Sequence, residues 1–361
     1  MSEAVNIGSD ITGLLGVKYA TGIQRVIVET HKRLFESSKK YNFNLKGLNF
    51  TSESSTTANK YILSDPVIQQ YQDNFDGINL ALELDGSNSR FYSRYTSSLI
   101  KPKVISLIHD LMPITHPNFY YKDASTHFRG YLLRALVMSD CIIVTSNETR
   151  KELTKVNFKY NGAIELIPLG AHSTNPVKRL VHNYDISLLV IATLEPKKGY
   201  KEILDAFDIL RSKGLNVLLT IVGVYGWNLE EIRQRITNHE CYNNELVWLN
   251  SGISDDEIDL LYGRADIAIA SSYVEGFGFA IEEGLAKGVK VIARDIPVFK
   301  ERPNLNLFYF HDTGENLAMK IIEVKNTNID SELLSTNIRT MDDFSRELLG
   351  VIKYNIVNKQ I

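Results

Sequence analysis

A turn that contains Gly276 and Gly278 has the clearest chemical content in the sequence. It follows a short apolar run, residues 267–270, that predicts a strand, and it precedes a predicted helix that begins near Phe279. The first amides of a helix have no partner within it, and the helix dipole is positive there. A strand, a glycine-containing turn and a helix start therefore favour a site for a phosphate or diphosphate. A plain tight turn is the alternative.

Two carboxylates flank this turn. Glu275 lies within it, and Glu283 lies further along, in the predicted helix. A carboxylate repels a phosphate, so we expect both side chains to face sugar hydroxyls, whose hydrogen bonds they can accept. Glu282 lies roughly 100° around the helix from Glu283, and we expect it to face solvent.

The residues of this turn and helix resemble the E-x7-E signature of retaining nucleotide-sugar glycosyltransferases with the GT-B fold. The likeness is to glycosyltransferase family 4, and within it to bacterial mannosyltransferases. The matching residues are Glu275, Gly276, Phe277, Gly278 and Glu283. The resemblance implies that Glu275 holds the transferred sugar and that Glu283 holds the ribose or the sugar. It also implies that the amides of residues 276–279 contact the donor diphosphate.

A second loop, residues 192–200, follows another predicted strand and contains Lys197 and Lys198. Two adjacent lysines alone are usually a solvated surface feature. Beside the E-x7-E signature, the loop resembles the phosphate-binding loop of the family, with Lys198 at the second cationic position. Many family members have Gly-Arg at the start of this loop, where this sequence has Ala192 and Thr193. Lys197 is the residue expected to compensate for the missing arginine.

Two further loops resemble those that line the nucleotide pocket of the family. Ser254 and Glu257 form a capping-box pattern that predicts a helix start. The resemblance implies that Gly252 and Ile253, just before this helix, contact the nucleobase through their backbone. It likewise places Gly223, which follows an apolar strand, at the pocket wall.

The N-terminal half matches the family more loosely. Gly13 lies in a glycine-rich stretch that resembles the loop closing over the donor phosphate, and Arg25 follows in the first predicted helix. His109 is the first polar residue after a predicted strand, and the resemblance implies that it faces the donor sugar near the reacting carbon. A structural histidine and a solvated arginine are the alternatives. Asp85, also after a strand, is either an acceptor-binding residue or a turn residue.

The elements that must position these residues alternate along the chain. Short β-branched runs and longer amphipathic stretches follow one another, which predicts an α/β fold with parallel sheets. The 361 residues correspond to two domains at about 150 residues each. We expect a first Rossmann-like domain at 1–172, a linker at 173–185 and a second at 186–341. A terminal helix, 342–361, has an apolar stripe and is expected to dock on one of them, the first domain being one candidate. The resemblance implies that the two domains of a GT-B fold face each other across a cleft.

The implied reaction moves a hexose from a nucleoside diphosphate to an acceptor hydroxyl with retention. Glu275, Lys198 and His109 are the implied catalytic residues. The leaving phosphate takes the acceptor proton, and no metal or other cofactor is expected because no DxD run is present. GDP-mannose is the expected donor, with GDP-fucose, dTDP-rhamnose and UDP-sugars left open. The expected acceptor is a growing surface glycan such as O-antigen or capsule, either free or linked to a lipid.

The charge balance and the apolar runs exclude several classes of protein. Forty basic residues face 43 acidic ones, a net charge of −3, which argues against a nucleic-acid binder. No apolar run reaches the roughly 18 residues of a membrane span, and no secretory signal is seen. We therefore expect a cytoplasmic protein. Charges on the first helix, His31, Lys32 and Arg33 with Lys39 and Lys40, suggest a peripheral contact at the inner membrane face; a solvated helix end is the alternative.

Two other functions remain open on the sequence. A nucleotide-sugar epimerase of the same fold would convert the sugar without an acceptor. A carbohydrate-binding protein would keep the fold and lack catalysis. A dinucleotide dehydrogenase is disfavoured because no G-x-G-x-x-G opens the first strand–helix unit.

Overall fold

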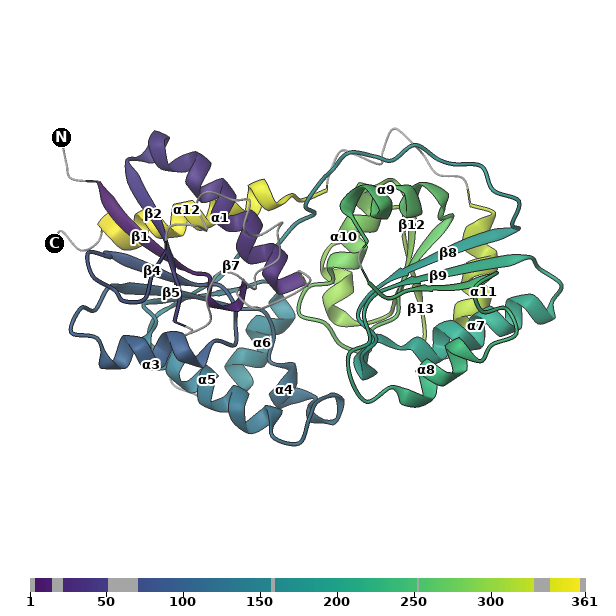
Figure 1. Cartoon of the computed structure of the whole chain (residues 1–361), viewed down its shortest axis with the longest axis horizontal. Coiled ribbons are helices and arrows are strands. Elements are labelled where there is room, and N and C mark those ends of the chain that lie inside the picture. The colour runs from purple at the N-terminus through teal and green to yellow at the C-terminus, as the bar shows by residue number, and fades with distance from the viewer. Residues whose placement is uncertain are drawn as a thin grey trace. The chain divides into compact units, whose positions relative to one another are not determined.

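The computed structural model describes residues 4–14, 22–50, 71–156, 160–251, 253–327 and 338–357. The chain divides into two compact units, each an α/β layer structure (Figure 1). The first unit combines residues 1–170 with 341–361, and the second holds residues 171–340. Residues 173–185 belong to the second unit, where Val177 N donates to Lys287 O and Leu180 N donates to Gly263 O.

The first unit contains a parallel sheet of seven strands in the order β3-β2-β1-β4-β5-β6-β7. The strands are β1 (Val5–Asp10), β2 (Phe43–Leu48), β3 (Tyr71–Gln72), β4 (Leu80–Glu83), β5 (Lys103–Ile108), β6 (Cys141–Val144) and β7 (Ala163–Leu166). The helices are α1 (Gly22–Tyr41), α3 (Ser89–Ser97), α4 (Met112–Thr115), α5 (Ala124–Met138), α6 (Asn147–Lys155) and α12 (Met341–Val357). Every residue of β4 and β6 is buried, as expected for parallel strands covered on both faces.

The second unit contains a parallel sheet of six strands in the order β10-β9-β8-β11-β12-β13. The strands are β8 (Ile186–Ile191), β9 (Val217–Val222), β10 (Leu246–Leu249), β11 (Ile267–Ala270), β12 (Lys290–Arg294) and β13 (Leu307–Phe310). The α-helices are α7 (Tyr200–Ser212), α8 (Glu230–Thr237), α9 (Asp255–Arg264), α10 (Phe279–Ala286) and α11 (Gly314–Lys325), with short 3₁₀ turns at Pro196–Lys198 and Pro297–Glu301.

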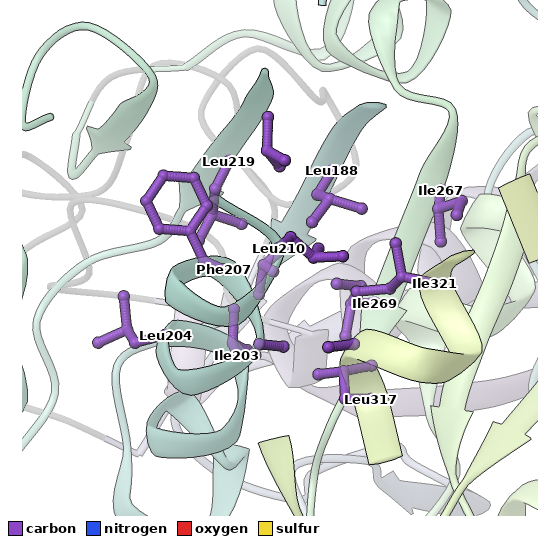
Figure 2. Packing of buried hydrophobic residues seen from close by; sticks show 14 of the residues in the cluster. Leu188, Ile203, Leu204, Phe207, Leu210, Leu219, Ile267, Ile269, Leu317 and Ile321 are labelled. Atoms are coloured by element: carbon purple, nitrogen blue, oxygen red, sulfur yellow. The ribbon is translucent and has the colours of Figure 1, made fainter. Parts of the chain in front are cut away.

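The core of the second unit fixes the strands that end at the predicted donor loops. Figure 2 shows apolar side chains of α7 and α11, among them Phe207 and Leu317, packed against Leu188 of β8 and Ile269 of β11. On the other face, α10 contributes Ile281 to a second buried cluster. Because β8 and β11 are buried between helices on both faces, the loops at their carboxyl ends start from rigid positions.

In both sheets the strand order reverses beside the first strand of the unit. The reversal lies between β1 and β4 in the first sheet and between β8 and β11 in the second. Ligands of open α/β sheets bind at the carboxyl ends of the strands at such a switch point. The α/β class with two Rossmann-like parallel sheets, predicted from the sequence, is confirmed.

Two predicted helix starts are confirmed in detail. Helix α10 begins at Phe279 after Gly278. Helix α9 begins after Ser254, whose Oγ accepts from Glu257 N at 3.3 Å while Glu257 Oε2 accepts from Ser254 N at 2.8 Å. The sequence does not predict α3, α11 or the edge strand β13.

Helix α12 returns to the first unit and packs on α1. Its Phe344 and Leu348 are fully buried, and its Asp342 accepts a hydrogen bond from Arg33 of α1. Of the charges that suggested a membrane contact, His31 is buried and Arg33 also bonds Glu29, whereas Lys39 and Lys40 lie in the last turn of α1. Among the described residues, no helix is long and apolar enough to span a bilayer.

Candidate active site

Two loops meet at the switch point of the second sheet. One follows β8 and leads through Pro196–Lys198 into α7; the other follows β11 and leads into α10. Tyr273 N donates to Lys197 O at 2.8 Å. Ser271 Oγ donates to Lys198 O at 2.6 Å. The two loops are therefore bonded to each other through the backbone of the lysine pair.

The predicted residues Lys198 and Glu275 form an ion pair across these loops. Lys198 Nζ lies 2.5 Å from Glu275 Oε1, and Ser272 Oγ donates to the same oxygen at 2.7 Å. The side chains of Lys198 and Glu275 are only 19% and 14% exposed. Residues from segments far apart in the sequence thus form one partly shielded charge centre.

Glu275 is ionised at any physiological pH. Burial alone would raise its pKa, but the charges of Lys198 and Lys197 and the hydrogen bonds from Lys198 and Ser272 outweigh burial and lower the pKa to about 2. The carboxylate can therefore accept hydrogen bonds and keeps its negative charge beside the lysines.

Glycines are required where the two loops touch their neighbours. Gly199 has φ +63°, and a Cβ there would lie 2.4 Å from the Ser271 carbonyl oxygen. Gly278 has φ +99°, and a Cβ there would lie 2.6 Å from the Phe299 ring. Only glycine adopts these conformations at such close approach without strain. The side chain of Phe277, which follows Gly276 in the same turn, is buried.

Glu283 lies beside a histidine that the sequence does not single out. His172 Nε2 lies 3.8 Å from Glu283 Oε1, and the His172 ring stacks on Phe279 at 5.2 Å between centroids. A histidine and an aromatic ring thus contact the helix start on the side where Glu283 projects.

The prediction that Glu282 faces solvent is wrong. Its side chain is 5% exposed, and its Oε1 lies 2.6 Å from Arg302 Nε. Arg302 also donates to Phe277 O at 2.6 Å, and its guanidinium group lies 3.9 Å from the Phe277 ring centroid. Arg302 follows the 3₁₀ turn after β12. It covers the side of α10 that the periodicity of the helix predicts to face solvent.

The loop after β9 contacts the start of the β8 loop. Gly223 has φ +154°, and a Cβ there would lie 2.0 Å from Ala192 O. Trp248 Nε1 donates to Gly223 O at 2.8 Å. Ile253 packs on the cluster beneath α10, while Gly252 lies outside the described residues.

Arg294 supports both loops and is missed by the sequence reasoning. Its side chain is 3% exposed, its Nε donates to Ser271 O at 2.8 Å, and its Nη2 lies 3.3 Å from Glu202 Oε2. The Tyr273 hydroxyl donates to Glu202 Oε1 at 2.6 Å, and Arg294 lies over the Tyr273 ring. Two features of the sequence could have pointed to Arg294. It ends an apolar strand, and the polar residues Ser271 and Ser272 directly follow the neighbouring strand β11.

The predicted residues of the first unit gather at its own switch point. His109 Nε2 lies 2.9 Å from Leu84 O, and burial lowers the pKa of His109. A Cβ on Gly13 would lie 1.9 Å from Asp85 Oδ2, so Gly13 is in close contact with that carboxylate. Arg25 lies half-buried in the first turn of α1; residues 15–21, between it and Leu14, are outside the described part.

Two buried carboxylates lie at the same switch point. Burial is the main cause that raises the pKa of Asp10 to about 7, and the charge of Asp85 adds to it, while hydrogen bonds from Thr12 and Asn88 oppose it. Burial also raises the pKa of Glu83, which accepts from the Tyr131 hydroxyl at 2.7 Å. Within the described ranges, no three His, Cys, Asp or Glu side chains are placed to share a metal ion.

Comparison with known proteins addresses the second unit directly. Residues 174–341 match the family model of glycosyl transferases group 1. The match covers almost the whole of the second unit and a little less than half of the chain. The resemblance to glycosyltransferases predicted from the E-x7-E and Lys198 segments is confirmed, because both segments lie inside the residues that match this family model.

Curated relatives of the chain include mannosyltransferases. The serotype-specific mannosyltransferase WbdA of Escherichia coli is 29% identical over 236 residues, which cover 60% of this chain and 29% of that protein. The O-antigen chain mannosyltransferase RfbU of Salmonella typhimurium strain LT2 is 24% identical over 64% of each chain. The match therefore spans less than a third of the length of WbdA.

Solved structures show the same fold across the chain. Sucrose-phosphate synthase from Thermosynechococcus elongatus has a TM-score of 0.71 at 14% identity and covers 98% of this chain and 100% of its own. HepE from Anabaena, in complex with UDP and glucose, has a TM-score of 0.72 at 14% identity, with 97% and 100% coverage. The GT-B class predicted from the sequence is confirmed, because these structures share the fold over almost the whole chain.

Proposed function

We propose that the protein is a retaining hexosyltransferase that needs no metal and transfers mannose from GDP-mannose to a hydroxyl of a surface glycan. The observation that supports this most directly is the Lys198–Glu275 pair at the switch point, beside the start of α10. It places a cation, an ionised carboxylate and helix amides around one position, which suits a sugar diphosphate. The names of WbdA and RfbU support mannose and an O-antigen-type acceptor.

Lys198, Lys197 and the amides of residues 276–279 stabilise the leaving diphosphate. Negative charge develops on the diphosphate as its bond to the anomeric carbon breaks, and donors already in position lower the energy of that state. Lys198 shares its charge between Glu275 and the diphosphate. Glu275 remains ionised because its pKa is about 2, and it accepts hydrogen bonds from hydroxyls of the transferred sugar.

In the proposed transfer, the acceptor oxygen attacks the anomeric carbon from the face that the diphosphate leaves. The new C–O bond forms as the old one breaks, and the acceptor proton passes to the leaving phosphate oxygen. The anomeric configuration is thereby retained. His109, in the first unit, stays a prediction as the residue facing the donor sugar.

Calorimetric titration with GDP, UDP, dTDP and ADP, in the presence of EDTA, tests the donor site. We expect GDP to bind, and we expect Lys198→Ala to weaken its binding roughly tenfold to a hundredfold through the loss of charge-assisted bonds. Binding of UDP in preference to GDP would contradict the donor assignment. No binding by any diphosphate, or unchanged binding by Lys198→Ala, would contradict the site.

Incubation with GDP-mannose and a mannan-type acceptor then tests the reaction. NMR of the product reports the anomeric configuration, and retention is expected. Conversion of the donor sugar without an acceptor would indicate an epimerase instead. Glycan binding without any turnover of the donor would indicate a carbohydrate-binding protein.

A further inference from the structure

The outer surface of α3 and α5 forms one continuous face of the first unit. The two helices lie side by side over the same side of the sheet (Figure 1), and the rings of Tyr92 and Tyr131 pack between them at 5.7 Å. Near their C-terminal ends, Thr96 Oγ1 donates to Met138 Sδ at 3.6 Å. We call this surface the α3–α5 face and define it by the exposed residues Arg90, Arg94, Leu99, Arg129, Leu133, Arg134 and Val137.

The charges that α3 and α5 contribute to the α3–α5 face are all positive, and at its edge Arg129 lines a hollow with Glu152 of α6. Arg90 and Arg94 lie on α3, Arg129 and Arg134 lie on α5, and neither helix contains an acidic residue. In the described part of the chain, none of these guanidinium groups forms an ion pair, and all four residues are exposed. This is a local basic excess in a chain whose net charge is −3.

Apolar side chains project from the same face. Leu99, just past α3, is 99% exposed, and Val137 and Leu133, one turn apart on α5, are 72% and 47% exposed. Single exposed apolar residues are ordinary, but a group of them rimmed by cations marks an interaction surface. These three apolar side chains are not needed for the core of the unit, because α3 and α5 already pack on it through other residues.

We propose that the α3–α5 face docks on the surface of an anionic lipid bilayer. Arginines attract anionic headgroups, and apolar side chains between them enter the headgroup–acyl boundary. A polyanion in solution would be matched by the arginines alone and would leave Leu99 and Val137 without a role. The combination therefore favours a lipid surface. The first helix, α1, is the weaker candidate because His31 is buried and Arg33 is neutralised by Glu29 and Asp342.

Vesicle co-sedimentation of the full chain tests the electrostatic part. Phosphatidylglycerol–phosphatidylcholine vesicles are compared with pure phosphatidylcholine vesicles at low and high sodium chloride. Wild type is expected to pellet with the anionic vesicles strongly at low salt and weakly at high salt. Added GDP is expected to diminish this pelleting only slightly. The double variant Arg129→Glu, Arg134→Glu is expected to lose binding by well over tenfold, at roughly fivefold per charge removed. The matched control Lys39→Glu, Lys40→Glu makes the same charge change on α1 and is expected to lose less than about threefold.

The double variant Leu99→Ser, Val137→Ser tests the apolar part. Both side chains are exposed, so melting temperatures are expected to stay near wild type, while the binding that persists at high salt disappears. Three results would overturn the proposal. They are no pelleting of wild type with anionic vesicles at low salt, equal losses in the arginine and lysine variants, and unchanged vesicle binding in the serine variant. The last result, with tight binding to soluble heparin, would assign the face to a polyanion. None of these readouts depends on transferase activity.

Discussion

Two buried carboxylates at the two switch points show how one neighbour decides the charge of a site. Glu275 has Lys198 in contact, and its pKa falls to about 2. Asp10 is bonded by the amide of Asn88 and by the side chain and backbone of Thr12, none of which is a cation, and burial raises its pKa to about 7. Both residues are removed from water, so the difference comes from the cation. The second unit thus holds a fixed negative charge, whereas the first holds a carboxyl that titrates near neutrality.

Replacement of Glu275 by Gln is expected to lower the rate of transfer on the order of a hundredfold, because the amide lacks the negative charge that holds the sugar hydroxyls and orients Lys198. The melting temperature is expected to change little. The matched control is Glu323→Gln, which removes the carboxylate of an exposed Lys–Glu pair with Lys320 on α11. Steady-state kinetics of both variants give the comparison, and near-normal turnover by Glu275→Gln would mean that the donor site lies elsewhere.

Stability of the first unit is expected to fall as pH rises from about 4 to about 7. The pKa of Asp10 is 3.8 in an unfolded chain and about 7 in the folded one, so the folded state prefers the protonated form and loses its advantage as that proton leaves. The loss is at most roughly 4 kcal/mol. Hydrogen exchange of β1 and β4 amides across this range measures it. Asp10→Asn should flatten the dependence; an unchanged slope would contradict the assignment.

At the scale of elements, the donor loops act as one body. The loop after β8 and the loop after β11 share hydrogen bonds through Lys197 and Lys198, and the buried Arg294 binds Ser271 from below. A displacement of either loop therefore moves both the lysines and Glu275. At Gly199, close contact with the Ser271 carbonyl oxygen leaves no room for a side chain between the two loops.

Gly199→Ala is expected to weaken GDP binding roughly tenfold or more, because the added methyl group forces the loops apart. Gly214→Ala is the matched control: Gly214 also has a positive φ, +81°, but nothing lies within 4 Å of its Cβ position. Both variants share a backbone strain of about 1–2 kcal/mol. Calorimetry and thermal melting separate the two effects. Equal losses of affinity in both would show that strain alone matters.

The sequence predicts the central strands of the second unit well. Strand β11 has its predicted bounds, 267–270, because it is a continuous apolar run between polar turns. Strand β13 is missed since it is a short edge strand with half-buried positions. Lys198 and Glu275 are each predicted, but their ion pair depends on β8 lying beside β11, which no local pattern reveals. The prediction that Glu282 faces solvent is wrong for the same reason, because Arg302, from a distant segment, covers its side chain.

At the scale of the whole molecule, the second unit is an insertion within the first. The chain leaves the first unit after Gly170 and returns at Met341. Where it returns, Ala171 N donates to Arg339 O at 2.8 Å, so the outgoing and returning segments run together. Helix α12 then supplies part of the core of the first unit.

Phe344→Ala on α12 is expected to lower the free energy of unfolding of the first unit by about 3–5 kcal/mol, since a fully buried ring is replaced by a cavity. The GDP affinity of the second unit is expected to be unchanged. Hydrogen exchange resolves the two units, and nucleotide titration checks the site. Equal loss of protection in both units would mean that they unfold as one.

The place of α12 in the chain also sets an order of events during translation. A ribosome makes β1–β7 first, yet the first unit lacks α12 until residues 341–357 have emerged. Every residue of the second unit emerges earlier, so that unit has its complete set of strands and helices while the first still exposes the apolar surface that α12 covers. Domains commonly fold in the order of their synthesis. Here the unit that starts the chain is the one that closes last.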